Sequence, residues 1–160
     1  MTYKQPVSVL VVIHTPGLKV LLIERRDFAE AWQSVTGSRD GDETLTDTAR
    51  REVFEETGID ATGYALTDWR HTNEYEIFPV WRHRYAPGVT CNTEHVFSLQ
   101  VPSELPVTLS PSEHVRYRWV DWAQAADMVF SPSNAEAIRA LPAKSADYLA
   151  MSSSGGRSGS

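Results

Sequence analysis

The sequence predicts an α+β domain in which helices pack on a mixed β-sheet. A run of β-branched and apolar residues at 7–14 indicates a buried strand, and residues 44–57 have the period of an amphipathic helix. Four more strand-like segments separate this helix from two short helical segments near the C-terminus. One early helix and two late helices around such a set of strands are typical of an α+β fold with helices packed against a mixed sheet.

The chain begins with a predicted hairpin. The strand Val7–His14 is followed by Thr15-Pro16-Gly17, and proline and glycine are typical of turns. Leu18–Arg25 is therefore expected to return as the second strand of the hairpin. Residues 28–37 show no clear period and are predicted to form a loop.

The clearest element is the helix predicted at Thr44–Thr57. Gly58 follows it, and a glycine in the left-handed conformation is a common helix C-cap. Asp42 and Thr44 are both in position to cap the N-terminus of the helix. Glu43, taken alone, is explained by the preference of acidic residues for the first turn of a helix, where the helix dipole is positive.

The second half of the chain is predicted to contain strands at 60–69, 74–83, 94–101 and 115–120, and helices at 122–130 and 134–141. Residues 152–160 consist of serine, glycine and one arginine, a composition that cannot offset the entropy of ordering. The chain of 160 residues is therefore expected to form one domain over residues 1–142, with residues 143–160 as a disordered tail.

The composition limits the partners and the compartment of the protein. The 15 lysines and arginines and 21 aspartates and glutamates give a formal charge of -6, which argues against a nucleic-acid partner. The longest apolar run, at 7–13, is far shorter than the ~20 residues that span a bilayer, so no membrane partner is expected. No small-residue cleavage site follows that run. The single cysteine, Cys91, excludes an internal disulfide, and a cytoplasmic location is expected.

The helix at 44–57 carries acidic residues on the side that should face the sheet. At ~100° per residue, Glu52 and Glu56 fall within ~20° of Leu45, and Glu55 flanks them. Carboxylates inside an apolar stripe persist only if they are protonated or paired with cations. A solvated acidic face, the common alternative, fits poorly because these residues share the apolar side. Their spacing suits Mg²⁺, or alternatively Mn²⁺, both of which take carboxylate oxygens.

The same segment resembles the Nudix box, G-x5-E-x7-R-E-U-x-E-E-x-G-U, in which U is apolar. Many members of that family carry a glycine directly before the first glutamate, whereas here Asp42 stands there and Gly41 lies one place earlier. The resemblance implies the Nudix fold, an α/β/α sandwich. Every specified position is filled, by Gly37, Glu43, Arg51, Glu52, Val53, Glu55, Glu56, Gly58 and Ile59.

The resemblance also implies metal-dependent hydrolysis of a linkage of the type X-P-O-P. Glu52 and Glu56 would be the principal metal ligands, and Glu55 a further ligand or a general base. Metal ions that bridge phosphate oxygens would let a net-acidic protein bind a polyanion. Attack of water at the α- or at the β-phosphorus, one metal ion or several, and any oligomeric state are all compatible with the sequence.

Segments outside the box resemble one group within this family, the bacterial dihydroneopterin triphosphate pyrophosphohydrolases of the folate pathway. The resemblance covers most of residues 3–134, and its most distinctive part is Arg82-His83-Arg84-Tyr85-Ala86-Pro87-Gly88. It implies hydrolysis of 7,8-dihydroneopterin triphosphate to the monophosphate and pyrophosphate. One alternative is a pyrophosphohydrolase of deoxy or oxidised purine nucleotides, whose guanine shares the amino-pyrimidinone edge of a pterin. Another is a non-catalytic nucleotide-binding module, although such modules usually lack the metal-ligand glutamates.

This second resemblance suggests further site residues. Lys4 and Arg25 would contact the triphosphate, and Glu113 would be an additional metal ligand or base from outside the helix. His83 is expected to be structural rather than an acid or base, and Trp81 is expected to pack. The complete set of substrate-binding residues implied by the resemblance is Lys4, Arg25, Thr36, Tyr75, Glu76, Ile77, Phe78 and Ser131.

Overall fold

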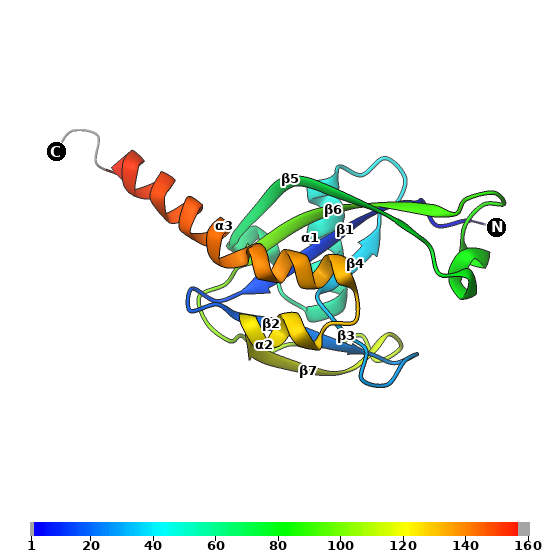
Figure 1. The fold of residues 1–160 in the computed structure, drawn as a ribbon, viewed down its shortest axis with the longest axis horizontal. Coiled ribbons are helices and arrows are strands. Elements are labelled where there is room, and N and C mark those ends of the chain that lie inside the picture. The colour runs from blue at the N-terminus through cyan, green and yellow to red at the C-terminus, as the bar shows by residue number, and fades with distance from the viewer. Residues whose placement is uncertain (1, 157–160) are drawn as a thin grey trace.

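The computed structural model describes the backbone of residues 2–156 and the side chains of residues 2–145. Its centre is one mixed sheet of seven strands in the order β3-β2-β1-β6-β5, with β4 paired to β1 and β7 paired to β2 (Figure 1). Strands β1 and β6 run parallel, and the other pairs are antiparallel. The strands are β1 (Val7–His14), β2 (Lys19–Arg25), β3 (Trp32–Gln33), β4 (Val35–Ser38), β5 (Ala65–Glu76), β6 (Cys91–Gln100) and β7 (His114–Asp121).

Helices cover both faces of the sheet, which confirms the predicted α/β/α arrangement. Helix α1 (Leu45–Thr57) lies on one face, and α2 (Trp122–Met128) and α3 (Pro132–Gly156) lie on the other (Figure 1). The alternation of side chains along β1 supplies both cores, because successive residues of a strand point to opposite faces. Val9, Val11 and Ile13 pack with the residues of α1, and Leu10 and Val12 pack with those of α2 and α3. No helix in the described part of the chain is long and apolar enough to cross a membrane.

The helix that carries the sequence motif begins and ends close to the predicted positions. Thr44, rather than Asp42, is its N-cap, and the Thr44 hydroxyl accepts a hydrogen bond from the backbone N–H of Asp47 at 3.1 Å. Gly58 ends the helix with φ 75° and donates its N–H to the Phe54 carbonyl. A left-handed backbone of this kind costs glycine nothing, which explains a glycine at this position.

Two segments differ from the prediction because their structure depends on pairing with distant strands. The segment 28–37, predicted as a loop, contains β3 and the start of β4, which pair with β2 and β1. The predicted division of this region into two strands, at 60–69 and 74–83, is also wrong. A single strand, β5, bends at an irregularity between Asp68 and Thr72, and Pro79–Arg84 form a 3-10 helix, η2. Short strands show too few residues for a local period, and Pro79 cannot donate to a ladder.

The C-terminal helix is longer than predicted. Helix α3 continues to Gly156, with Pro142 inside it, and its last turns project away from the body of the molecule (Figure 1). Residues 143–156, expected to be disordered, therefore lie in this helix, and residues 157–160 lie outside the described residues. Alanine, lysine, leucine and methionine between 143 and 151 are good helix formers, and they continue a helix that is already packed on the sheet. The division at residue 142 stays a prediction.

Asn134 ties the start of α3 to the segment between β3 and β4. Its Oδ1 accepts the backbone N–H of Ser34 at 2.8 Å, and its Nδ2 donates to the Ser34 hydroxyl at 3.0 Å, both in the interior. We expect Asn134→Ala to lower the free energy of unfolding by about 2 kcal/mol, because it leaves a buried N–H without an acceptor. Urea unfolding would measure this loss. The exposed Glu136→Ala on the same helix should change stability by less than about 0.5 kcal/mol, and equal losses would contradict the role of Asn134.

Candidate active site

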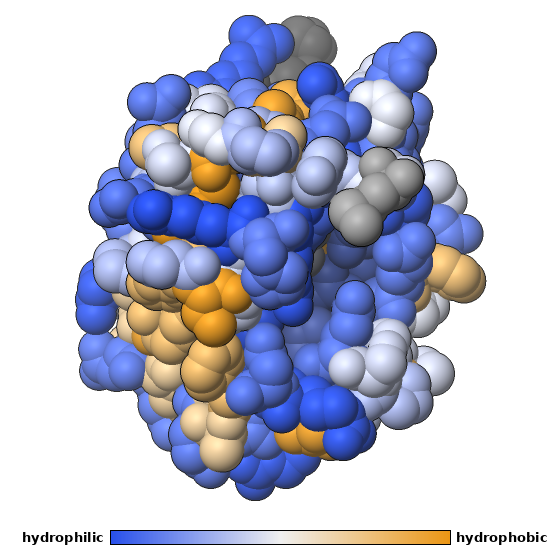
Figure 2. All heavy atoms as spheres, turned by 90° about the vertical axis from the view of Figure 1, so that its right-hand side faces the viewer, coloured by the Kyte–Doolittle hydropathy of each residue, from blue (hydrophilic) through white to orange (hydrophobic). Residues whose placement is uncertain are grey.

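A cavity of about 680 Å³ opens beside the N-terminal half of β1. Its walls come from α1, β4, the N-terminal segment, the end of β2, η2 and the turn before β7. Figure 2 shows the side of the molecule that carries the N-terminus, which is hollowed and largely hydrophilic around the hollow. Elements far apart in the sequence thus contribute to one polar cavity.

Helix α1 turns two of its glutamates into this cavity, as the helical period predicted. The side chains of Glu52 and Glu56 are 13% and 2% exposed. Glu52 lies directly against the backbone of β4 at Gly37, where a Cβ atom would come within 2.0 Å of the Glu52 carboxyl carbon. A side chain at position 37 would therefore displace the carboxylate, which explains the glycine in the sequence motif.

Glu56 is a buried acid without a counter-charge. Burial, and secondly the adjacent Glu52 carboxyl, raise the pKa of Glu56 well above its ordinary value, and burial also raises the pKa of Glu52. The Oε1 atom of Glu56 accepts no hydrogen bond, although it lies 3.8 Å from Nε2 of His114. Burial lowers the pKa of His114 to about 4, so this imidazole is neutral at pH 7. Such an acid is stabilised only by a proton or by a cation that the chain itself does not supply.

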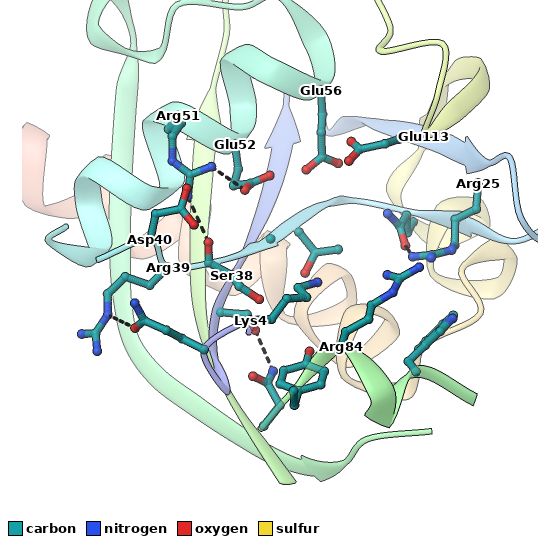
Figure 3. Close-up of a pocket in the computed structure, with 18 of the residues that line it drawn as sticks. Lys4, Arg25, Ser38, Arg39, Asp40, Arg51, Glu52, Glu56, Arg84 and Glu113 are labelled. Carbon is teal, nitrogen blue, oxygen red and sulfur yellow. Dashed lines mark hydrogen bonds and ion pairs between the residues drawn. The ribbon is translucent and has the colours of Figure 1, made fainter. Parts of the chain in front are cut away.

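The site fits a divalent cation held jointly with phosphate. Glu113, from the turn before β7, points toward the same space as Glu52 and Glu56 (Figure 3). Among the described side chains, no three Asp, Glu, His or Cys residues lie close enough to enclose a metal ion. Mg²⁺ does not need such a cage, because it usually takes one or two carboxylates and completes its shell with water and substrate phosphate. The all-oxygen donor set and the unpartnered Oε1 of Glu56 therefore suit Mg²⁺ or Mn²⁺.

Arg51 holds the acidic side of the cavity in place. It forms a fork with Glu43, at 2.8 Å from Nε and 2.9 Å from Nη2, and donates to Glu52 at 2.8 Å. It also donates to Glu55, four residues later on the helix, at 3.2 Å, and to the Ser38 carbonyl. Because planar bidentate pairs fix orientation, Arg51 sets the rotamer of Glu52. Glu43 lies before the N-cap Thr44, outside the first turn in which it was expected, and acts mainly as the anchor of Arg51.

The fork between Arg51 and Glu43 predicts a pH-dependent stability. The Arg51 guanidinium lowers the pKa of Glu43 to about 2, below the ~4.3 of an unfolded glutamate. A depressed pKa contributes stability that is complete above the unfolded value and is lost as the pH falls toward 2. We expect Glu43→Gln to lower the free energy of unfolding at pH 7 by about 1 kcal/mol, and the difference to shrink below pH 4. Urea titrations at pH 7, 4 and 3 test this, with the exposed Asp47→Asn as control; a difference independent of pH would contradict it.

Four of the expected substrate-binding residues line the cavity, namely Lys4, Arg25, Thr36 and Tyr75. Arg25 is already engaged, because it donates twice to Asp27 at 2.7 Å and once to Gln33 at 3.3 Å. Burial, and then the nearby Arg84, lower the pKa of Lys4. Of the two expected cations, Arg25 is therefore partly neutralised by Asp27, and Lys4 is desolvated.

The other expected residues do not line the cavity. The Glu55 side chain is 54% exposed, beside Arg51. Glu76 is exposed and paired with Arg82 at 2.8 Å, Ile77 is buried, and Phe78 is exposed against Trp81. None of these residues is part of the cavity wall, and their roles stay predictions. Ser131 likewise does not line the cavity; its hydroxyl lies 3.1 Å from that of Ser133 at the start of α3.

Several cavity residues were not identified from the sequence. Arg84 lies within the distinctive run at 82–88 and Trp81 directly precedes it, so the resemblance carried by that run could have pointed to both. His114 adjoins Glu113 in the sequence and is buried with Nδ1 unpartnered. Asn92 lies in the segment Asn92-Thr93-Glu94, which also carries the second resemblance, and its Oδ1 is likewise buried without a partner. His83, expected to be structural, does not line the cavity, and its Nδ1 lies 3.0 Å from the Val80 carbonyl.

Comparison with known proteins gives consistent matches over nearly the whole chain. A model of the NUDIX domain matches residues 4–141. A dihydroneopterin triphosphate diphosphatase of Escherichia coli K12 is 49% identical over 139 residues, which are 85% of this chain and 91% of that protein. A Haemophilus influenzae protein of the same description is 44% identical over 142 residues, 87% of this chain and 89% of that one. The solved E. coli dihydroneopterin triphosphate pyrophosphohydrolase has a TM-score of 0.80 at 48% identity, covering 86% of this chain and 95% of that chain.

Proposed function

The chain belongs to the Nudix hydrolase family, and we propose from that premise that it hydrolyses 7,8-dihydroneopterin triphosphate to dihydroneopterin monophosphate and pyrophosphate. The observation that carries this proposal is the meeting of buried carboxylates from α1 with lysine and arginine side chains in one cavity. Such a cavity accommodates a phosphate chain together with a divalent cation. The two relatives above, which act on this substrate by their descriptions, support the choice of pterin.

The acidic residues have distinct roles in this proposal. Glu52 and Glu56 would hold Mg²⁺, with Mn²⁺ as an alternative, and Glu113 and Glu55 are further candidates for ligand or base. When bound there, the cation would supply charge neutralisation for the phosphate chain and would polarise the bond that is cleaved. Arg51 keeps Glu52 in one orientation through the fork with Glu43. Burial keeps water away from Glu56, which strengthens its attraction for the cation.

The basic residues position the substrate. Lys4 and Arg25 lie in the cavity with Glu52 and Glu56. The charge of Glu52 acts to raise the pKa of Lys4, which indicates that these two side chains are close. In the reaction, the oxygen of water forms a bond to phosphorus, the bridging P–O bond breaks, and the water proton is lost to a base or to solvent. Attack at the α- or the β-phosphorus gives the same two products, so their identity alone does not distinguish the two.

Product analysis tests the proposal directly. The purified chain with Mg²⁺ should release pyrophosphate from 7,8-dihydroneopterin triphosphate, not orthophosphate in steps. Initial rates on this substrate, dATP and 8-oxo-dGTP measure its preference, since guanine offers the same amino-pyrimidinone edge. A clear preference for the nucleotides would replace the pterin assignment by a nucleotide pyrophosphohydrolase, and the absence of hydrolysis of all three would favour a binding module. Reaction in ¹⁸O-labelled water locates the attacked phosphorus.

A further inference from the structure

The lysine and arginine side chains that line the cavity differ in whether they already donate hydrogen bonds to acceptors of the protein. Four of the six lysine and arginine side chains that line the cavity donate to protein acceptors. Arg25 is held by Asp27 and Gln33, and Arg51 by Glu43 and Glu52. The others in this group are Arg26, which donates to the Pro111 carbonyl, and Arg39, which donates to Gln5.

Arg84 and Lys4 have no such acceptor. Within the described side chains, neither the Arg84 guanidinium nor the Lys4 ammonium forms a hydrogen bond or an ion pair, although both line the cavity. In Figure 3 the Arg84 side chain points into the cavity, between Lys4 and Arg25. An arginine fork has five donors in a plane, and here they face a cavity without a protein partner.

The backbone holds these two cations side by side. The N–H of Lys4 donates to the Arg84 carbonyl at 2.9 Å, and Lys4 forms a parallel bridge with Tyr85. The Lys4 ammonium lies 5.9 Å from the centre of the Tyr85 ring. The charge of Arg84 contributes to the lowered pKa of Lys4, after burial, which indicates that the two like charges are close. The Glu52 and Glu113 carboxylates act on Lys4 in the opposite direction, but neither forms an ion pair with Lys4 or Arg84 among the described side chains. Like charges that no carboxylate pairs directly are stabilised when an anion binds between them.

We infer that Arg84, together with Lys4, is the principal anchor for the phosphate chain, and that its free donors bind phosphate oxygens more strongly than the engaged Arg25 does. This inference rests on the proposed function, because it names the group that holds the polyphosphate part of the substrate. The ligand class is a di- or triphosphate chain. Glu52, Glu56 and Glu113 lie in the same cavity, so a chain bound by Arg84 and Lys4 can also meet a cation held by these acids.

Binding of inorganic tripolyphosphate, measured by isothermal titration calorimetry on the full chain in EDTA, tests the inference without turnover and without a pterin. We expect Arg84→Gln to weaken binding by about tenfold or more, because a charge-assisted bidentate contact is lost. Arg84→Lys should recover part of the affinity through its charge. The matched control is Arg118→Gln, which removes an equal charge from an exposed residue of β7 outside the cavity and should change the affinity by less than about twofold.

A second measurement uses the enzyme with Mg²⁺. Arg84→Gln should raise KM and the inhibition constant of pyrophosphate by about tenfold, and lower kcat less than it raises KM. Thermal unfolding confirms that the variant is folded. Tripolyphosphate affinity equal to that of the unmodified chain, or a loss that Arg118→Gln shares, would overturn the inference. If the chain binds tripolyphosphate through Arg84 but does not hydrolyse the pterin substrate, the proposed function fails and the inference stands.

Discussion

Glu56→Gln should lower kcat by at least about 100-fold in the presence of Mg²⁺, with the fold unchanged. The amide has nearly the shape of the carboxyl group but carries no charge, so it cannot balance a divalent cation. Asp47→Asn on the exposed side of the same helix is the control and should keep kcat within about twofold. Steady-state rates and a Mg²⁺ titration measure both variants. An unchanged kcat in Glu56→Gln would contradict the assignment of Glu56 as a metal ligand.

The same variant should be at least as stable as the unmodified chain when no metal is bound. The pKa of Glu56 is raised in the folded state, so its ionisation favours unfolding as the pH rises above ~4.3, the value for an unfolded glutamate. We therefore expect the metal-free Tm of the unmodified chain to fall between pH 5 and pH 8 more than that of Glu56→Gln. Scanning calorimetry in EDTA at both pH values measures the difference. Greater stability together with lost turnover would show that Glu56 serves catalysis at the expense of the fold.

Gly37→Ala should also lower kcat, by about 100-fold, through a single added methyl group. The new Cβ would lie 2.0 Å from Cδ of Glu52 and 2.3 Å from its nearer oxygen, so the carboxylate must leave its place. It would then lose its present geometry with Arg51, and Mg²⁺ would be held less well. We expect the Mg²⁺ concentration for half-maximal activity to rise as well.

Gly63→Ala is the matched control for this variant, because no atom lies within 4 Å of its added Cβ. It should keep both kcat and the Mg²⁺ requirement. The Tm of Gly37→Ala should fall only slightly, since the Glu52 side chain can swing toward solvent. Normal activity in Gly37→Ala would show that Glu52 does not need its present position.

The inward orientation of the glutamates could be predicted from the sequence because it depends only on the helical period. Glu52 and Glu56 lie inside the molecule as the period required, and Phe54 on the opposite side is 60% exposed. The caps of α1 were also predictable, since Thr44 and Gly58 act through local backbone geometry.

The rest of the cavity depends on contacts between distant segments. Strand β4 forms because Val35 pairs with Val11 of β1, and no local pattern reveals that pairing. Arg84 reaches the cavity because η2 is hydrogen-bonded to the N-terminal segment. Ile77, expected in the substrate wall, is buried instead, since β5 ends one residue before it and the chain turns. Sequence periodicity describes one element at a time and carries no information about such neighbours.

The pairing of Lys4 with the segment that carries Arg84 has a practical consequence for making the protein. Thr2 and Tyr3 also line the cavity, so an affinity tag or a fusion partner placed before them would begin at its wall and compete for the space that the phosphate chain needs. The opposite terminus offers a safer attachment point, because α3 leads away from the body of the molecule (Figure 1). Kinetic work on this enzyme is therefore best done with material tagged at the C-terminus.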